Sequence, residues 1–162
     1  MQNYIFSLFL LLATGSHAAA QDAVYLIRHG EKELSGDDPA LTAEGRKRAA
    51  DWATMLGKVG VDAVFTSDAL RTKETGSIIA AELDLEANAL PTNDTAGLVD
   101  TLEFDHEGET VLVVAHAETI PSILGLLGVR ESITIDQSDF DNLFIVQRPS
   151  SEEQVFIHLT MP

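Results

Sequence analysis

The stretch Ala23-Val-Tyr-Leu-Ile-Arg-His-Gly-Glu-Lys32 decides the fold that we expect for this chain. Its apolar run, residues 24–27, stops abruptly at Arg28, His29 and Gly30. A short apolar run that ends at a glycine is typical of a buried strand followed by a loop. Because open α/β sheets bind ligands just beyond the carboxyl ends of their strands, the residues after this run are candidates for a functional site.

The three residues at the end of this run have the chemistry of an anion site. Arg28 carries a permanent charge on a planar fork that fits phosphate or carboxylate. His29 can act as a nucleophile or as an acid–base group near neutral pH. Gly30 allows close backbone approach or a positive φ. The alternative is a strand end with a surface arginine and a structural histidine, and these residues alone do not decide between the two.

The length of 162 residues is that of one domain with a substantial core. Residues 1–20 differ from the rest, because an apolar stretch, residues 5–13, is followed by small residues up to Ala20. This pattern predicts a secretory signal peptide cleaved near Ala20, since the stretch is too short to span a membrane. No Lys or Arg precedes it, so an uncleaved anchor is the alternative. We expect the mature domain, residues 21–162, to work in the periplasm without stable membrane insertion.

The composition excludes several classes of protein. The chain has no cysteine, which rules out disulfides, thiol catalysis and lipoprotein acylation. It has 26 acidic residues against 10 Lys and Arg, for a formal net charge of −16. Such a surface repels nucleic acid and anionic membranes, so we expect no nucleic-acid partner.

Strand-like and helix-like segments alternate along the rest of the chain. This alternation predicts an α/β fold of three layers, with a mostly parallel sheet between helices on both faces. Thr42 is expected to cap the first helix, and Ser67 or Asp68 the second. Residues 143–147 and 154–159 predict a C-terminal hairpin at an antiparallel sheet edge. The other expected strands cover residues 61–66, 85–90 and 110–115. Four helices are expected: two start near residues 42 and 67, and two more cover residues 96–104 and 120–127.

Three of the expected strands pass directly into polar turns that carry arginine or histidine. The turns bring Arg28 and His29, then Arg71, then His116. Because the carboxyl ends of parallel strands lie at one edge of a sheet, we expect these four side chains to converge.

The order and spacing of three motifs at these turns are similar to those of a known family. The motifs are Arg28-His29-Gly30-Glu31, the segment from Ser67 to Thr75 (SDALRTKET), and Val113-Val114-Ala115-His116. Together they resemble the histidine phosphatase superfamily, the phosphoglycerate mutase-like phosphatases, over residues 23–127. The chain is most similar to short members of the phosphohistidine phosphatase kind, because the large substrate-capping insertion of the mutases is missing.

The resemblance implies that His29 attacks phosphorus and forms a phosphohistidine. It also implies that Arg28, Arg71 and His116 hold the phosphoryl oxygens, and that no cofactor and no metal ion takes part. Elementary chemistry agrees, because a phosphoryl group in transfer carries negative charge that cations and N–H donors stabilise. Taken singly, Arg71 is more often a surface arginine and His116 a satisfied structural histidine. Taken jointly at three strand ends, they favour a phosphoryl site.

Four further residues are candidates for substrate contact or for the general acid. Gly30 and Glu31, next to His29, are expected to bind substrate. Glu118 stands where many relatives have asparagine. It is either a first-turn acid favoured by the helix dipole and facing away from the ligand, or a general acid with a raised pKa. Asp94, at a strand end, is the other candidate for the acid, and plain solvation is the alternative for each residue.

The sequence therefore predicts a secreted, cofactor-independent phosphatase that hydrolyses a phosphomonoester or a phosphorylated side chain. Its partner is accordingly a phosphorylated small molecule or a phosphoprotein. Mutase activity is not expected, because an open site lets water intercept the phosphoenzyme. One alternative is a non-catalytic anion-binding protein that keeps the same pocket, and another is a protein-interaction module that uses the acidic face.

Overall fold

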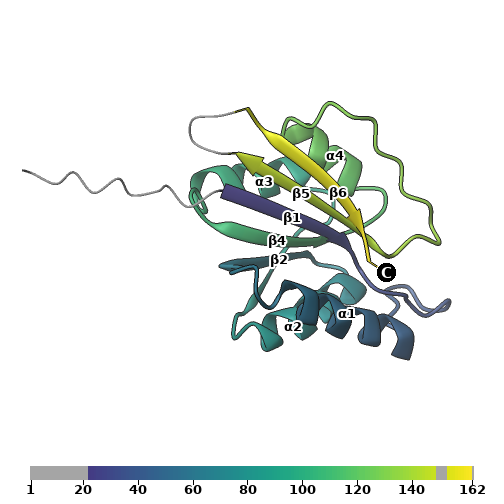
Figure 1. Ribbon diagram of the computed structural model, residues 1–162. Helices are drawn as coiled ribbons and strands as arrows, with labels where there is room; N and C mark the ends of the chain where they lie inside the picture. Colours follow the sequence, from purple (N-terminus) through teal and green to yellow (C-terminus); the bar gives the residue numbers. More distant parts are fainter. Residues whose placement is uncertain (1–21, 149–152, 162) are drawn as a thin grey trace, which may run out of the picture.

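A mixed sheet forms the middle layer of the protein (Figure 1). The computed structural model describes residues 22–148 and 153–161, and within them six strands pair in the order β3-β2-β4-β1-β5-β6. The first four strands of this order are parallel to one another. Strand β5 pairs antiparallel with both of its neighbours, β1 and β6. The expected α/β fold with a C-terminal edge hairpin is therefore confirmed. The strands are β1 (Asp22–Arg28), β2 (Ala63–Ser67), β3 (Ala87–Leu90), β4 (Thr110–Ala115), β5 (Asn142–Arg148) and β6 (Val155–Thr160).

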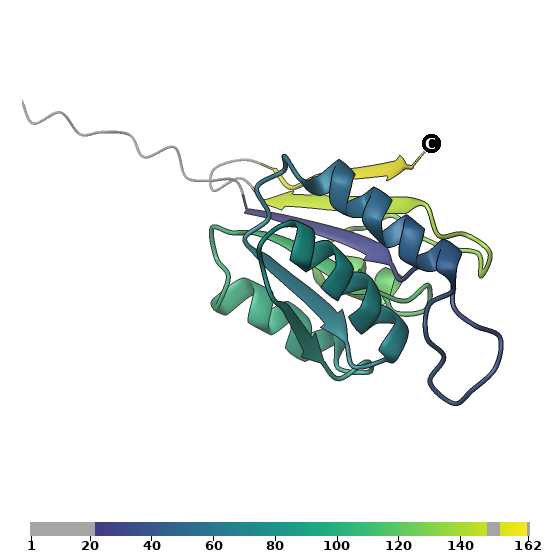
Figure 2. The ribbon, with the colours of Figure 1, turned by 90° about the horizontal axis from the view of Figure 1, so that it is seen from below.

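Two helices cover each face of the sheet (Figures 1 and 2). They are α1 (Ala43–Leu56) and α2 (Leu70–Glu82) on one face, and α3 (Thr95–Phe104) and α4 (Ile120–Leu126) on the other. Side chains of β4 alternate between the two cores, because successive residues of a strand point to opposite faces. Leu112 packs with Trp52 of α1, whereas Val113 packs with Leu98 of α3 and Ile123 of α4.

One helix start agrees with the sequence-based expectation, one was not anticipated, and one differs from it. Thr42 caps α1 by accepting from the Gly45 N–H, as expected, and Asp94 caps α3 by accepting from the Gly97 N–H. The expected cap of α2 by Ser67 or Asp68 is wrong: its N-cap is Ala69, with no side-chain cap. The physical reason is competition, because the Ser67 hydroxyl binds His116 and the Asp68 carboxylate accepts from the Thr92 N–H.

The register of the sheet places the carboxyl ends of three strands side by side. Arg28 of β1 pairs with Ala115 of β4, and Thr66 of β2 pairs with Val114 of the same strand. The residues that follow these positions therefore start from one edge of the sheet. None of the described helices is long and apolar enough to cross a membrane. The predicted signal peptide, residues 1–20, lies outside the described residues.

Candidate active site

His29, the first residue after β1, has its two ring nitrogens in different hydrogen bonds. Its Nδ1 lies 2.7 Å from the carbonyl oxygen of Gly30, which can only accept, so Nδ1 carries the proton. On the other side of the ring, the Arg71 Nε–H donates to Nε2 across 3.2 Å. Burial lowers the pKa of His29 to about 3, and the charges near it act in the same direction. His29 is therefore neutral at pH 7, with a lone pair on Nε2.

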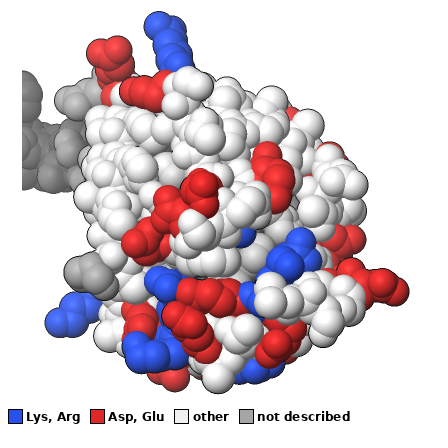
Figure 3. All heavy atoms as spheres, turned by 90° about the vertical axis from the view of Figure 1, so that its right-hand side faces the viewer, with Lys and Arg blue, Asp and Glu red and all other residues white. Residues whose placement is uncertain are grey.

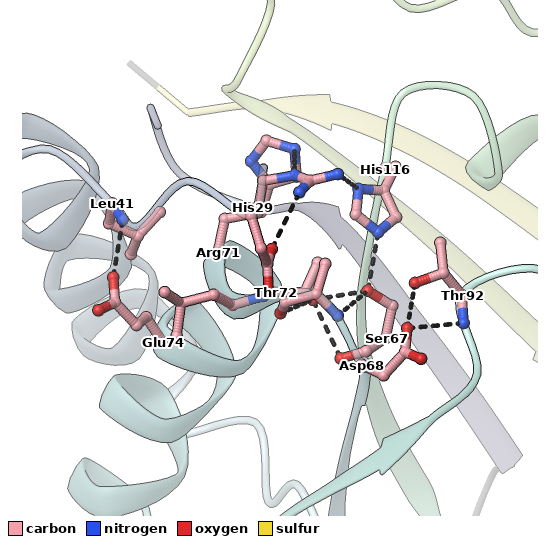
Figure 4. A network of polar contacts seen from close by, with 12 residues as sticks. His29, Leu41, Ser67, Asp68, Arg71, Thr72, Glu74, Thr92 and His116 are labelled. Atoms are coloured by element: carbon pink, nitrogen blue, oxygen red, sulfur yellow. Dashed lines mark hydrogen bonds and ion pairs between the residues drawn. The ribbon is translucent and has the colours of Figure 1, made fainter. Parts of the chain in front are cut away.

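Arg71, in the first turn of α2, lies between the two histidines (Figure 4). Its Nη2 is 3.2 Å from Nδ1 of His116, and the imidazole rings of His29 and His116 are 5.2 Å apart between centroids. Asp38, from the loop between β1 and α1, lies 3.7 Å from Nη1 of Arg71. The Asp38 carboxylate also accepts from the Leu70 N–H at the start of α2. The loop therefore holds the arginine and the helix start together.

His116 lies in the turn between β4 and α4, and it is as buried as His29. Its Nε2 is 2.7 Å from the hydroxyl oxygen of Ser67 at the end of β2. Burial, followed by the charge of Arg71, lowers the pKa of His116 to about 4. The acidic side chains of Glu118 and Asp68 oppose this shift without reversing it.

Arg28, the last residue of β1, is almost fully buried, and it organises the segment from Asp136 to Phe140. Its guanidinium lies 4.0 Å from the centre of the Phe140 ring. Its Nη2 donates to Oε1 of Gln137 across 3.2 Å, while its Nε has no partner among the described residues. Nη1 donates to three backbone carbonyls, those of Asp136 at 3.1 Å, Gln137 at 2.9 Å and Asp139 at 2.9 Å. Arg28 thus fixes this segment and keeps one buried donor unused.

Gly30 and Glu31 are tied to α1. A Cβ on Gly30 would lie 2.5 Å from the carbonyl oxygen of Gly45, so the close approach expected of Gly30 is to a helix. Gly30 is not one of the described residues with a positive φ, so its backbone does not use the conformational freedom that glycine allows. The Glu31 carboxylate pairs with Arg48, at 2.5 Å from Nη2 and 2.8 Å from Nε. Burial opposes ionisation of Glu31, but the bond to Arg48 outweighs it and the pKa is lowered. Substrate binding by Gly30 and Glu31 stays a prediction.

Neither candidate for the general acid has the environment that this role requires. Glu118 is exposed in the turn before α4, and its Oε1 accepts from Nε2 of Gln137 across 2.9 Å. Backbone and Gln137 hydrogen bonds lower its pKa, which is opposite to the raised pKa of a general acid. Glu118 also lies outside the first turn of the helix, where one interpretation placed it. The Asp94 carboxylate is engaged as the cap of α3, at 2.9 Å from the Gly97 nitrogen.

Several residues of this edge were not singled out from the sequence as site residues. Ser67 was interpreted as a helix cap, and Asp38 belongs to a polar loop with no periodic pattern. Segment 136–140 lacks both helical and strand periodicity, so only its contacts with Arg28 reveal its position. The sequence did contain one indication for Ser67: it ends a strand whose carboxyl end was expected beside those that carry His29 and His116.

Acidic side chains surround the cationic centre on this face of the molecule (Figure 3). Asp136 lies close enough to Arg28, and Asp68 close enough to His116, for their charges to interact. Glu118 interacts with both Arg28 and His116. No group of three or more potential metal ligands occurs among residues 22–148 and 153–161.

The fold and the site define an α/β protein in which two neutral histidines and two arginines come together at the carboxyl edge of the parallel strands. The model of the histidine phosphatase superfamily, branch 1, matches residues 24–92. Over this part of its length the chain is similar to the superfamily. The matched part contains three of the four converging residues, His29, Arg28 and Arg71, whereas His116 lies outside it.

Similar proteins carry several names. Over 64 residues the chain is 38% identical to "Probable phosphoglycerate mutase GpmB" of Escherichia coli, which covers 35% of this chain and 30% of that relative. The fold is similar to that of the protein histidine phosphatase SixA complexed with tungstate, with a TM-score of 0.71, 22% identity, and coverage of 85% and 96% of the two chains. It is also similar to a mycobacterial glucosyl-3-phosphoglycerate phosphatase, with a TM-score of 0.67, 12% identity, and coverage of 88% and 100%.

Proposed function

We propose that this protein is a phosphatase that hydrolyses a phosphomonoester or a phosphorylated side chain through a phosphohistidine on His29. The observation that carries the proposal is the state of the His29 ring. Its Nδ1–H is fixed on the Gly30 carbonyl, and its Nε2 lone pair faces the guanidinium of Arg71. A neutral imidazole is a nucleophile through its unprotonated nitrogen, and a cation beside it attracts the group to be attacked.

In the first step, Nε2 of His29 forms a bond to phosphorus while the bond to the leaving group breaks. The leaving group takes the electron pair of that bond, and the ring becomes cationic with its Nδ1–H still on Gly30. Arg71 turns its donors from the histidines to the phosphoryl oxygens. The orphaned Nε of Arg28 supports the same ligand, because a buried unsatisfied donor costs about 1–3 kcal/mol until an acceptor reaches it.

The leaving group must depart without much help from the protein. Glu118 is held ionised and Asp94 is committed to α3, so neither is a ready proton donor at neutral pH. We therefore propose substrates whose leaving group is stable without protonation or is a nitrogen, as in a phosphorylated histidine side chain or an activated small ester. The name of the similar SixA protein is consistent with this substrate class.

We propose a periplasmic location on the basis of residues 1–20. The apolar stretch and the small residues before position 20 predict export and cleavage near Ala20. N-terminal sequencing of the protein from fractionated cells tests this. A periplasmic protein that starts at Gln21 supports the proposal, and an intact N-terminus in the cytoplasmic fraction contradicts it.

Turnover of an aryl phosphate without added metal tests the phosphatase proposal. The wild type is expected to turn over and to contain a phosphoenzyme that is labile in acid and stable in base, whereas His29→Ala shows neither. His106→Ala is the matched control, because His106 pairs with Glu109 just before β4 begins, at the opposite edge of the sheet. This control is expected to retain full activity.

The state of the two acids also favours a second function, that of a non-catalytic anion-binding protein. Such a protein would bind vanadate and show no turnover of an aryl phosphate or of a phosphohistidine peptide. Turnover of either substrate that is lost in His29→Ala excludes it. Loss of the Arg71 guanidinium, in Arg71→Gln, is expected to weaken vanadate binding under both functions, whereas partner binding by a protein-interaction module would be unaffected by that change.

A further inference from the structure

The hydroxyl groups of Ser67 and Thr72 form a chain behind His116 (Figure 4). Nε2 of His116 is 2.7 Å from Oγ of Ser67, which is 2.6 Å from Oγ1 of Thr72. Thr72 lies in the first turn of α2 and is fully buried, and its Oγ1 is 2.8 Å from the carbonyl oxygen of Ala69. The catalytic roles proposed above use none of these hydroxyl groups.

The groups at the two ends of this hydrogen-bonded series determine which atom donates in each of its hydrogen bonds. At one end, the Ala69 carbonyl can only accept, so the Thr72 hydroxyl donates to it and accepts from the Ser67 hydroxyl. With its proton used in this way, Ser67 Oγ accepts from Nε2 of His116. At the other end, the guanidinium of Arg71 can only donate, so Nδ1 of His116 accepts. Both ends therefore require the same tautomer of His116, in which Nδ1 cannot donate to a phosphoryl oxygen as the resemblance implied.

We propose that Ser67 and Thr72 are positioning residues that hold His116 as the Nε2–H tautomer, so that its unprotonated Nδ1 faces the site and accepts a proton during hydrolysis of the phosphoenzyme. Two independent contacts, to a hydroxyl chain and to a guanidinium, give the same assignment. The lowered pKa of His116 is consistent with a neutral ring at pH 7. The part of this inference that concerns turnover rests on the proposed function.

The step balances without any further group. Once the donors of Arg71 lie on the phosphoryl oxygens, Nδ1 of His116 is free to accept. A water oxygen forms a bond to phosphorus and gives one proton to Nδ1 of His116, while the bond from phosphorus to Nε2 of His29 breaks. The electron pair of that bond returns to His29, which becomes neutral again with its proton on Nδ1. His116 then releases its proton to solvent or to the departing phosphate.

The first test is the ¹⁵N spectrum of the histidine side chains, in which protonated and unprotonated ring nitrogens differ in chemical shift. The signals of His116 are assigned by their loss in His116→Asn. The wild type is expected to have its proton on Nε2, and Thr72→Val is expected to lose this preference, because the freed Ser67 hydroxyl can then donate to the ring. Thr72→Ser keeps the hydroxyl and is expected to restore the wild-type spectrum.

The second test is the steady-state level of phosphoenzyme during turnover of an aryl phosphate. Thr72→Val and Ser67→Ala are expected to lower kcat by about tenfold or more, as a wrong tautomer does, and to accumulate phosphoenzyme. Thr101→Val is the matched control, because the Thr101 hydroxyl donates to the backbone carbonyl of Gly97, one turn earlier on α3. Thermal unfolding verifies that each variant is folded.

Three results would overturn the inference: a proton on Nδ1 in the wild type, an unchanged spectrum in Thr72→Val, or no accumulation of phosphoenzyme in the folded variants while the wild type turns over. If the wild type forms no phosphoenzyme at all, the proposed function fails. The spectra then still decide whether the hydroxyl chain holds the tautomer.

Discussion

The Nε–H of Arg71 donates to Nε2 of His29 across 3.2 Å, so a cation covers the nitrogen that we propose as the nucleophile. The same guanidinium reaches Nδ1 of His116. One side chain therefore occupies both imidazole acceptors until an anion takes its donors. Under the proposed function, substrate binding exchanges these contacts for contacts with phosphoryl oxygens.

Removal of the Arg71 charge is expected to raise the pKa of both His29 and His116. The cation is one of the causes that lower each pKa, although burial is the larger cause for both residues. NMR titration of Arg71→Gln measures the two values. Arg130→Gln, on the exposed surface, is the control and is expected to leave both unchanged. A pKa of His29 that does not rise in Arg71→Gln contradicts the contact.

Substitution by lysine is expected to distinguish the roles of the two arginines, because Arg71 serves activity and Arg28 also serves stability. Arg71→Lys loses the fork that contacts both histidines, and kcat/KM is expected to fall about 100-fold with little change in stability. Arg28→Lys is expected to lose stability as well, by about 3 kcal/mol, because one ammonium cannot serve three carbonyls and Gln137 from a buried position. Urea unfolding and turnover measured on both variants check this contrast. Equal stability of the two variants would refute the structural role of Arg28.

Gly30→Ala is expected to be severely destabilising. The added methyl would overlap the backbone of Gly45, which belongs to α1 and has little freedom to move. Gly125→Ala is the matched control, because the same addition at the exposed position 125 of α4 meets no atom within 4 Å. Alanine there is expected to be neutral or to stabilise by up to about 1 kcal/mol. The change in melting temperature relative to the wild type should therefore be several degrees more negative for Gly30→Ala than for Gly125→Ala.

The free energy of unfolding is expected to decrease as pH falls from about 6.5 towards 4. The pKa of His29 falls from 6.5 to about 3 on folding, and that of His116 to about 4. Below pH 6.5 the unfolded chain therefore binds more protons than the folded one, and protonation favours unfolding. Urea unfolding at about pH 7.5 and about pH 5 measures the effect. This dependence of the free energy of unfolding on pH is expected to diminish when both histidines are replaced by glutamine. If the double variant shows the same dependence on pH as the wild type, the result counts against neutral, buried rings.

Polyanionic substrates are expected to be poor. The carboxylates of Asp68, Glu118 and Asp136 border the cationic centre, and the chain carries a net charge of −16. Inositol hexakisphosphate is therefore expected to have a much lower kcat/KM than a simple aryl phosphate, and added salt should narrow the difference. Efficient turnover of the hexakisphosphate at physiological ionic strength would show that this border does not control access.

The sequence by itself determined the elements and the edge at which the site lies. Strand β4 spans residues 110–115 as expected, and Thr42 caps α1, because apolar period and cap chemistry act between residues close in the chain. The convergence of Arg28, His29, Arg71 and His116 also followed, since parallel strands place their carboxyl ends together.

Only the tertiary structure decided which partner each polar side chain takes. Ser67 binds His116 and does not cap α2, Glu31 pairs with Arg48, and Arg28 serves carbonyls more than 100 positions away. These choices depend on which donors and acceptors are left unsatisfied when distant elements meet, and no local pattern records that. For the same reason the proton positions on His29 and His116, on which the proposed chemistry depends, emerge only when every neighbour of the two rings is in place.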